Sequence, residues 1–138
     1  MKTTKTTKTT KTTKENCIDP FSYSVIGCAI EVHRALGPGL LESAYEKCLA
    51  HELLLAKIPF ENQFPLPINY KKIRLDCGYR LDFFVANYLV VELKSVESIN
   101  KLHHAQLLTY MKLANARLGL IINFNAIPLK NGITRFAL

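Results

Sequence analysis

The sequence predicts one α/β domain of the α+β type, in which helices flank a mixed β-sheet. Three observations lead to this prediction: two helical patterns come first, four strand-like segments follow, and one further helix precedes two last strand-like segments. The expected order of elements is α-α-β-β-β-β-α-β-β. A chain of 138 residues is long enough to form one domain with a sizeable core.

The basic balance of the chain comes mainly from its first residues. Residues 1–15 read MKTTKTTKTTKTTKE, with no apolar residue after Met1, so we expect a disordered Lys-Thr-Thr tail before a domain at 16–138. Five lysines lie in the first 14 residues, and the rest has 13 basic and 11 acidic residues, a net of +2 out of +7. The tail is either a solvated extension or a basic arm with non-specific affinity for phosphate backbones.

Cysteine usage and hydropathy predict the cellular setting. The four cysteines are widely spaced and form no CxxC or Cys/His pattern typical of zinc: Cys17, Cys28, Cys48 and Cys77. We expect reduced thiols, most of them packed in the core. No apolar run approaches the ~20 residues that span a bilayer, and no signal peptide is evident. These features predict a soluble, cytoplasmic protein.

The first two helices are predicted by their ends and their periodicity. Asp19 followed by Pro20 is a typical helix start, and Gly37 is a typical helix end. Between them, apolar residues recur at helical spacing: Phe21, Val25, Cys28, Val32 and Leu36. A second helix is expected over about 40–56. Glu42 lies in its first turn, where the helix dipole alone favours an acid, and Tyr45 follows on the same face.

Residues 60–70 alternate apolar and polar side chains and are predicted to form one strand. Pro65 and Pro67 lack an amide donor, which places this strand at an edge of the sheet. A turn at 70–72 leads into a second strand at 73–77. The basic residues here could contact a nucleic-acid backbone, although such residues more often only solvate a loop: Lys71, Lys72 and Arg74.

The stretch RLDFFVANYLVVELK at 80–94 predicts a β-hairpin at the centre of the sheet. Its loop is Ala86-Asn87-Tyr88, because Asn tolerates a left-handed backbone. Side chains alternate between two faces. The expected apolar face carries Leu81, Phe83, Val85, Leu89, Val91 and Leu93. The other face carries Arg80, Asp82, Phe84, Val90, Glu92 and Lys94.

This register sets Asp82 directly opposite Glu92, with Lys94 on the same face. Like charges that face each other across a ladder are destabilising, and a divalent cation would relieve the repulsion. Mg²⁺ (or Mn²⁺) is the expected ion, since Mg²⁺ prefers oxygen ligands and usually takes one or two carboxylates. The alternative is an exposed polar face on which Lys94 or Arg80 neutralises the acids.

The last part of the chain predicts a helix and two strands. A helix over about 102–115 carries Gln106 and Tyr110 on one face, with His103 on the same side. Ordinary amphipathic packing would also explain these positions. The apolar run at 118–124 is typical of a buried strand, and a short strand is expected at 133–137.

Two motifs resemble those of a known family. Asp82 with Glu92-Leu93-Lys94 resembles the signature of the PD-(D/E)XK nuclease superfamily, with Leu81 in place of the proline. Gly39, Glu42 and Tyr45 match the GxxExxY motif of one small bacterial and archaeal family within it. The resemblance covers about 17–138 and extends through the stretches His103–Gln106, Tyr110 and Gly119–Phe124. It implies a restriction-endonuclease-like fold with an αβββαβ core.

The resemblance also implies roles for individual residues. Glu42 would join Asp82 and Glu92 as a metal ligand, and Tyr45 would pack against the sheet and orient its helix. Gln106 and Tyr110 would support the lysine and the substrate phosphate.

Two functions are compatible with these residues. The first is a metal-dependent phosphodiesterase acting on DNA or RNA, in which Lys94 positions a metal-activated water or stabilises the transition state. The second is a non-catalytic binding or assembly module, favoured by the small, nearly neutral domain. The presence of Glu42, Asp82, Glu92 and Lys94 together argues for the first. A homodimer is compatible with a domain of this size, although no sequence feature indicates one.

Overall fold

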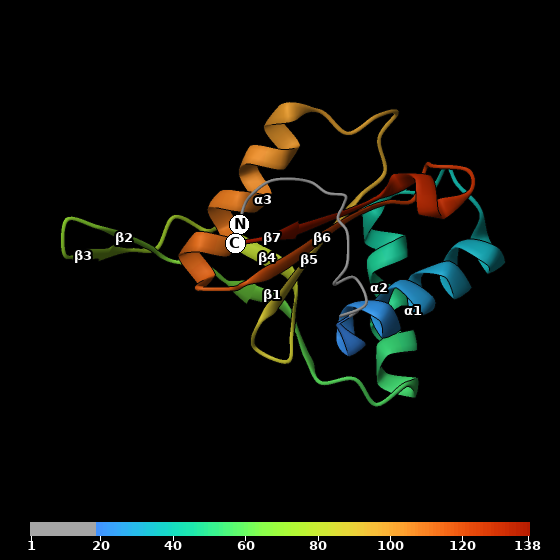
Figure 1. Cartoon of the computed structure of the whole chain (residues 1–138), viewed down its shortest axis with the longest axis horizontal. Helices are drawn as coiled ribbons and strands as arrows, with labels where there is room; N and C mark the ends of the chain where they lie inside the picture. The colour runs from blue at the N-terminus through green and yellow to red at the C-terminus, as the bar shows by residue number, and fades with distance from the viewer. Residues whose placement is uncertain (1–18) are drawn as a thin grey trace.

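The computed structural model describes residues 19–138, so the tail predicted at 1–15 lies outside the described residues (Figure 1). The chain forms, in order, α1 (Pro20–Leu36), α2 (Glu42–Leu55), β1 (Phe60–Pro65), β2 (Ile68–Tyr70), β3 (Ile73–Leu75), β4 (Arg80–Val85), β5 (Leu89–Lys94), α3 (Lys101–Ala114), β6 (Leu118–Asn123), the 3₁₀ helix η2 (Leu129–Gly132) and β7 (Ile133–Ala137). None of the helices within 19–138 combines the length and apolar character needed to span a bilayer.

The strands form one mixed sheet and one separate hairpin. The five-stranded sheet has the order β1-β4-β5-β6-β7, in which β5 and β6 are parallel and the other neighbours are antiparallel. Strands β2 and β3 pair only with each other. Helices α1 and α2 lie on one side of the sheet and α3 on the other (Figure 1). The α+β fold class and the restriction-endonuclease-like arrangement are thereby confirmed.

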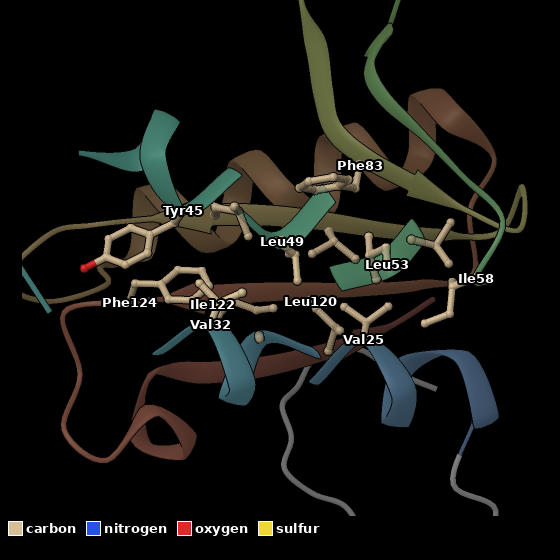
Figure 2. Packing of buried hydrophobic residues seen from close by; sticks show 14 of the residues in the cluster. Val25, Val32, Tyr45, Leu49, Leu53, Ile58, Phe83, Leu120, Ile122 and Phe124 are labelled. Atoms are coloured by element: carbon tan, nitrogen blue, oxygen red, sulfur yellow. The ribbon is translucent and has the colours of Figure 1, made fainter. Parts of the chain in front are cut away.

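Each face of the sheet has its own hydrophobic core. The first core joins α1 and α2 to the sheet (Figure 2) and includes Val25, Val32, Tyr45, Leu49, Leu53, Phe83, Leu120, Ile122 and Phe124. The second core lies under α3 and includes Leu66, Leu81, Phe84, Val90, Leu107, Met111, Ile121 and Phe136. Both faces are therefore covered, which explains the near-continuous apolar run of β6.

The helix ends follow the sequence prediction. The Asp19 side chain accepts a hydrogen bond of 2.9 Å from the Ser22 amide at the start of α1, and Gly37 follows its last residue. The Tyr88 hydroxyl also donates to Asp19, at 2.7 Å, and so links α1 to the loop between β4 and β5. Of the cysteines within the described residues, Cys28 and Cys48 are half-buried beside the first core, but Cys77 is exposed.

The central hairpin has the predicted strands, loop and register, with one difference. Phe83 pairs with Val91 and Val85 with Leu89, and the loop residues Ala86 and Asn87 have φ angles of 52° and 62°. The difference is Leu81, which was expected on the apolar face with Phe83 but packs in the second core. The alternation of β4 is therefore interrupted at Asp82.

The prediction of a single strand over 60–70 is wrong. The segment divides into two strands, β1 and β2, on either side of Leu66-Pro67. Strand β1 lies at the edge of the sheet, as its prolines predicted. Phe60 packs beside the first core and Phe64 beside the second, although residues four apart share a face in a regular strand. Gln63 lies between them with a φ of 54°, and this left-handed backbone changes the face of the strand.

Candidate active site

The carboxylates of Asp82 and Glu92 lie where the ladder between β4 and β5 ends. The last paired residues are Phe83 and Val91. Beyond them the Asp82 amide donates to Glu92 Oε2 at 2.8 Å, and the Leu93 amide donates to Asp82 Oδ2 at 2.9 Å. Each carboxylate thus accepts the amide of the opposite strand, and the two acids are held side by side as the register predicted.

Burial raises the pKa of both acids. The Glu92 side chain is only 7% exposed; its burial is the main cause of its raised pKa, and the charge of Asp82 raises it further. Burial is also the main cause at Asp82, opposed by the hydrogen bond from Leu93 and reinforced by the charges of Glu46 and Glu42. The metal-free pair therefore favours a protonated state around neutral pH.

Among the residues that the structure describes, no basic side chain forms an ion pair with these two acids. Within residues 19–138 the one ion pair joins Arg34 and Glu31, at 2.7 Å. Lys94 lowers the pKa of both acids through its charge without forming an ion pair with either. The alternative in which Lys94 or Arg80 neutralises the acids by direct contact is therefore not what the structure shows.

A layer of polar side chains from α2 and β1 surrounds Asp82. Glu46 Oε2 accepts hydrogen bonds from Asn62 Nδ2 at 2.8 Å and from Gln63 Nε2 at 2.7 Å. The same Asn62 nitrogen donates to the Asp82 carbonyl at 2.7 Å, and Gln63 Nε2 lies 3.4 Å from Asp82 Oδ1. Glu46, Asn62 and Gln63 were not predicted as site residues, although Glu46 follows Glu42 by four residues and so shares its face of α2.

The GxxExxY residues shape the loop that leads into α2. Gly39 has a φ of 102°, a conformation that favours glycine. The buried Tyr45 hydroxyl donates to the Gly37 carbonyl and accepts from the Leu40 amide at 3.1 Å, while its ring stacks on Phe124 at 4.3 Å. Tyr45 therefore packs against the sheet, and its hydroxyl fixes the loop that places Glu42 at the first residue of α2.

This loop is also fastened to the end of β5. Ser95 Oγ donates to the Leu40 carbonyl at 2.6 Å, and Asn125 Oδ1 accepts from the Gly39 amide at 3.1 Å. The Asn123 side chain, only 4% exposed, bonds both the amide and the carbonyl of Val96. These bonds hold the start of α2 beside the strand that carries Glu92 and Lys94.

Helix α3 contributes the other wall of the site. Burial is the main cause of the raised pKa of Tyr110, and the charge of Glu92 is the second, while Gln106 acts in the opposite direction. Tyr110 thus lies within reach of the charge of Glu92, and the exposed Gln106 neighbours Tyr110 on α3. His103 instead caps α3, because its Nδ1 accepts from the Asn100 amide at 3.1 Å while Asn100 Oδ1 accepts from the His103 amide.

The donor set fits a cation that retains several water ligands. Within the described part of the chain, no three His, Cys, Asp or Glu side chains are already grouped to hold a metal, and the two acids held side by side are Asp82 and Glu92. Glu42 is nevertheless near enough for its charge to raise the pKa of Asp82. Two adjacent carboxylates, with water in the remaining positions, are a typical protein contribution to bound Mg²⁺.

A family model of the PD-(D/E)XK nuclease superfamily matches residues 19–136, and the chain belongs to this superfamily. Nucleases of this superfamily generally use divalent metals and bind nucleic acid. Comparison with curated proteins and with solved structures gave no match.

Proposed function

We propose that this protein is a metal-dependent nuclease of the GxxExxY type that hydrolyses phosphodiester bonds. The observation that carries the proposal is the pair of the half-buried Asp82 and the buried Glu92, which has no basic side chain in contact within residues 19–138. Two acids in contact are destabilising unless they share a proton or a cation. The superfamily membership supports a phosphodiester substrate.

Asp82 and Glu92 are the proposed ligands of Mg²⁺ or Mn²⁺, and the exposed Glu42 is the proposed further ligand. When bound, such an ion lowers the pKa of a water molecule and neutralises charge on the phosphate. Lys94 lies two residues beyond Glu92 on the same strand and would position the attacking water or stabilise the charge of the transition state. Gln106 and Tyr110 would orient the phosphate from α3.

Calorimetric titration of the full chain with Mg²⁺ and with Mn²⁺ tests this proposal, followed by cleavage assays on labelled double-stranded DNA, single-stranded DNA and RNA. We expect saturable binding and metal-dependent cleavage by the unmodified protein, and loss of both in Asp82→Asn. Glu61→Gln, which removes an exposed acid on β1, is the matched control and should behave as the unmodified protein. Absence of saturable binding at millimolar metal would favour a non-catalytic module that retains the nuclease fold.

A further inference from the structure

The β2–β3 hairpin contributes no residue to either hydrophobic core. It projects away from the five-stranded sheet (Figure 1), and residues 69–80 are exposed throughout. We name residues 68–80 the arm. The ring of Tyr70 is 55% exposed and so is the side chain of Ile73, although the two residues pair across the arm. A two-stranded hairpin with little packing of its own is marginally stable, so the arm is a candidate for contact with a partner.

Charge indicates which partner the arm would take. Residues 19–138 contain 13 Lys and Arg against 10 Asp and Glu, a net of +3. The arm contains one acid, Asp76, and four basic residues: Lys71, Lys72, Arg74 and Arg80. Its net charge is therefore also +3, so the remaining described residues have a net charge of zero. All four side chains are exposed. A domain whose net positive charge is concentrated on one projecting hairpin and on Arg80 at its base is complementary to a phosphate backbone.

The turn at the tip of the arm supports the same partner. Lys71 and Lys72 have φ angles of 47° and 71°, which are the left-handed values of a two-residue hairpin turn. Asn-Gly is strongly preferred there, because lysine is strained in this conformation. Two lysines at such a turn are therefore unfavourable for the fold, and a role for their charge would explain them.

The arm leaves the sheet at the same end as the candidate active site. The Leu66 amide donates to the Tyr79 carbonyl at 2.9 Å and so closes the base of the arm. The ring of Tyr79 lies 6.0 Å from the ring of Tyr110, whose pKa is raised in part by the charge of Glu92. From this base to the tip at Lys71 there are five residues, or about 17 Å of extended strand. That length corresponds to about five base pairs of a duplex.

We propose that the arm binds the duplex nucleic acid whose scissile bond is held at Asp82 and Glu92, with Lys71, Lys72 and Arg74 on phosphates about five base pairs beyond the base of the arm. This inference rests on the proposed function for the position of the scissile bond, although the binding itself does not require cleavage. A two-stranded ribbon can also enter a major groove, which suits an arm exposed on both faces. Self-association of two arms is disfavoured, because it would bring six positive charges together.

Two variants of the full chain test the arm. K71Q/K72Q/R74Q removes its charge, and K71N/K72G replaces the tip with the preferred turn sequence. The control K57Q/K112Q/R117Q removes the same kinds of charge from exposed positions outside the arm. Binding to a labelled 20-base-pair DNA duplex and to its single strand is measured in EDTA by fluorescence anisotropy over a range of salt concentrations.

We expect K71Q/K72Q/R74Q to weaken duplex binding at least about tenfold at ~0.1 M salt and to reduce the salt slope by about 2–3, since each phosphate contact contributes about 0.9. K71N/K72G should reduce the slope by about 2 while keeping or raising the melting temperature. The control should change neither the duplex affinity nor the salt slope. Unchanged binding in the arm variants, or an equal loss in the control, would overturn the proposal.

Two other outcomes would also overturn the proposal: a loss confined to the single strand, or a dimer that only the arm variants convert to monomer in sedimentation. Cleavage assays on the same proteins separate this proposal from the proposed function. If binding depends on the arm but no metal-dependent cleavage is found, the proposal that the arm binds nucleic acid stands and the proposed nuclease function is rejected. Cleavage and binding that are unaffected by the arm variants would do the reverse.

Discussion

Replacement of Asp82 with Asn tests whether the carboxylate pair destabilises the metal-free protein. The Leu93 amide donates a hydrogen bond of 2.9 Å to Asp82 Oδ2. Asn is similar in size to Asp and keeps an oxygen that can accept this bond, but it removes the negative charge beside Glu92. Burial, with the neighbouring acids, raises the pKa of Asp82 to about 6 and that of Glu92 to about 8. In the unfolded chain both groups ionise near pH 4.

The sign of the pH dependence follows from these values. Between about pH 4 and pH 8 the folded pair binds more protons than the unfolded chain, so the metal-free protein loses stability as the pH rises through this range. At pH 5 the pair is largely protonated, and Asp82→Asn should have little effect. At pH 8 the substitution removes the repulsion on Glu92, on the order of one pKa unit or about 1–2 kcal/mol. For a domain of this size that stabilisation corresponds to roughly 3–6 °C in melting temperature.

Thermal unfolding followed by circular dichroism in EDTA at pH 5, 7 and 8 measures the effect. The difference between Asp82→Asn and the unmodified protein cancels the contribution of groups that titrate alike in both. Glu61→Gln is again the control, since it removes an exposed acid on β1 that has no part in the pair. A variant that is less stable by the same amount at all three pH values would refute the reasoning, because Asp82 would then act mainly as an acceptor for Leu93.

Three further substitutions test the other parts of the site. Lys94→Ala should spare metal affinity in calorimetry but lower the cleavage rate about a hundredfold or more, as when one preorganised electrostatic group is removed; full activity with lowered metal-free stability would reject a catalytic role. Glu46→Gln should lower the pKa of Asp82, since the charge of Glu46 raises it, and so shift the pH dependence of calorimetric metal binding toward lower pH; an unshifted profile would contradict this. Tyr45→Phe keeps the stacked ring but loses the bonds to Gly37 and Leu40, and should lower the free energy of unfolding in urea by about 1–3 kcal/mol, whereas exposed Tyr23→Phe should leave it unchanged.

The parts of the fold that the sequence predicted are those that local chemistry determines. The central hairpin was predicted with its correct ends, because Asn87 marks the turn and the alternation on either side fixes the register. The start of α1 was likewise specified by Asp19 and Pro20. Each of these features depends on residues within a few positions of one another, so no knowledge of the tertiary structure was needed.

The parts that were missed depend on the backbone of one residue and on contacts between distant elements. Gln63 has a left-handed φ of 54°, which nothing in its residue type indicates, and it moves Phe60 and Phe64 to opposite faces. Glu46 became a neighbour of Asp82 only because α2 lies beside β1 and β4. Sequence could place Glu46 on the same face as Glu42, but it could not show what that face meets.

The left-handed Gln63 and the two neighbouring acids, Asp82 and Glu92, lie close together in the sheet, and their proximity is relevant to function. Gln63 lies between the pairs that join β1 to β4 and its side chain lies 3.4 Å from Asp82 Oδ1, while Glu92 on the next strand accepts the Asp82 amide. A left-handed residue within a strand costs about 1–2 kcal/mol, and the neighbouring acids Asp82 and Glu92, one half-buried and the other buried, add to that cost. A module that needed only a stable sheet would be better served by β-branched residues at these positions. Backbone strain and unfavourable charge persist where the surroundings hold them for a purpose, and nucleases of this superfamily generally use a divalent metal. The coincidence of Gln63, Asp82 and Glu92 therefore favours a catalytic site over a binding module.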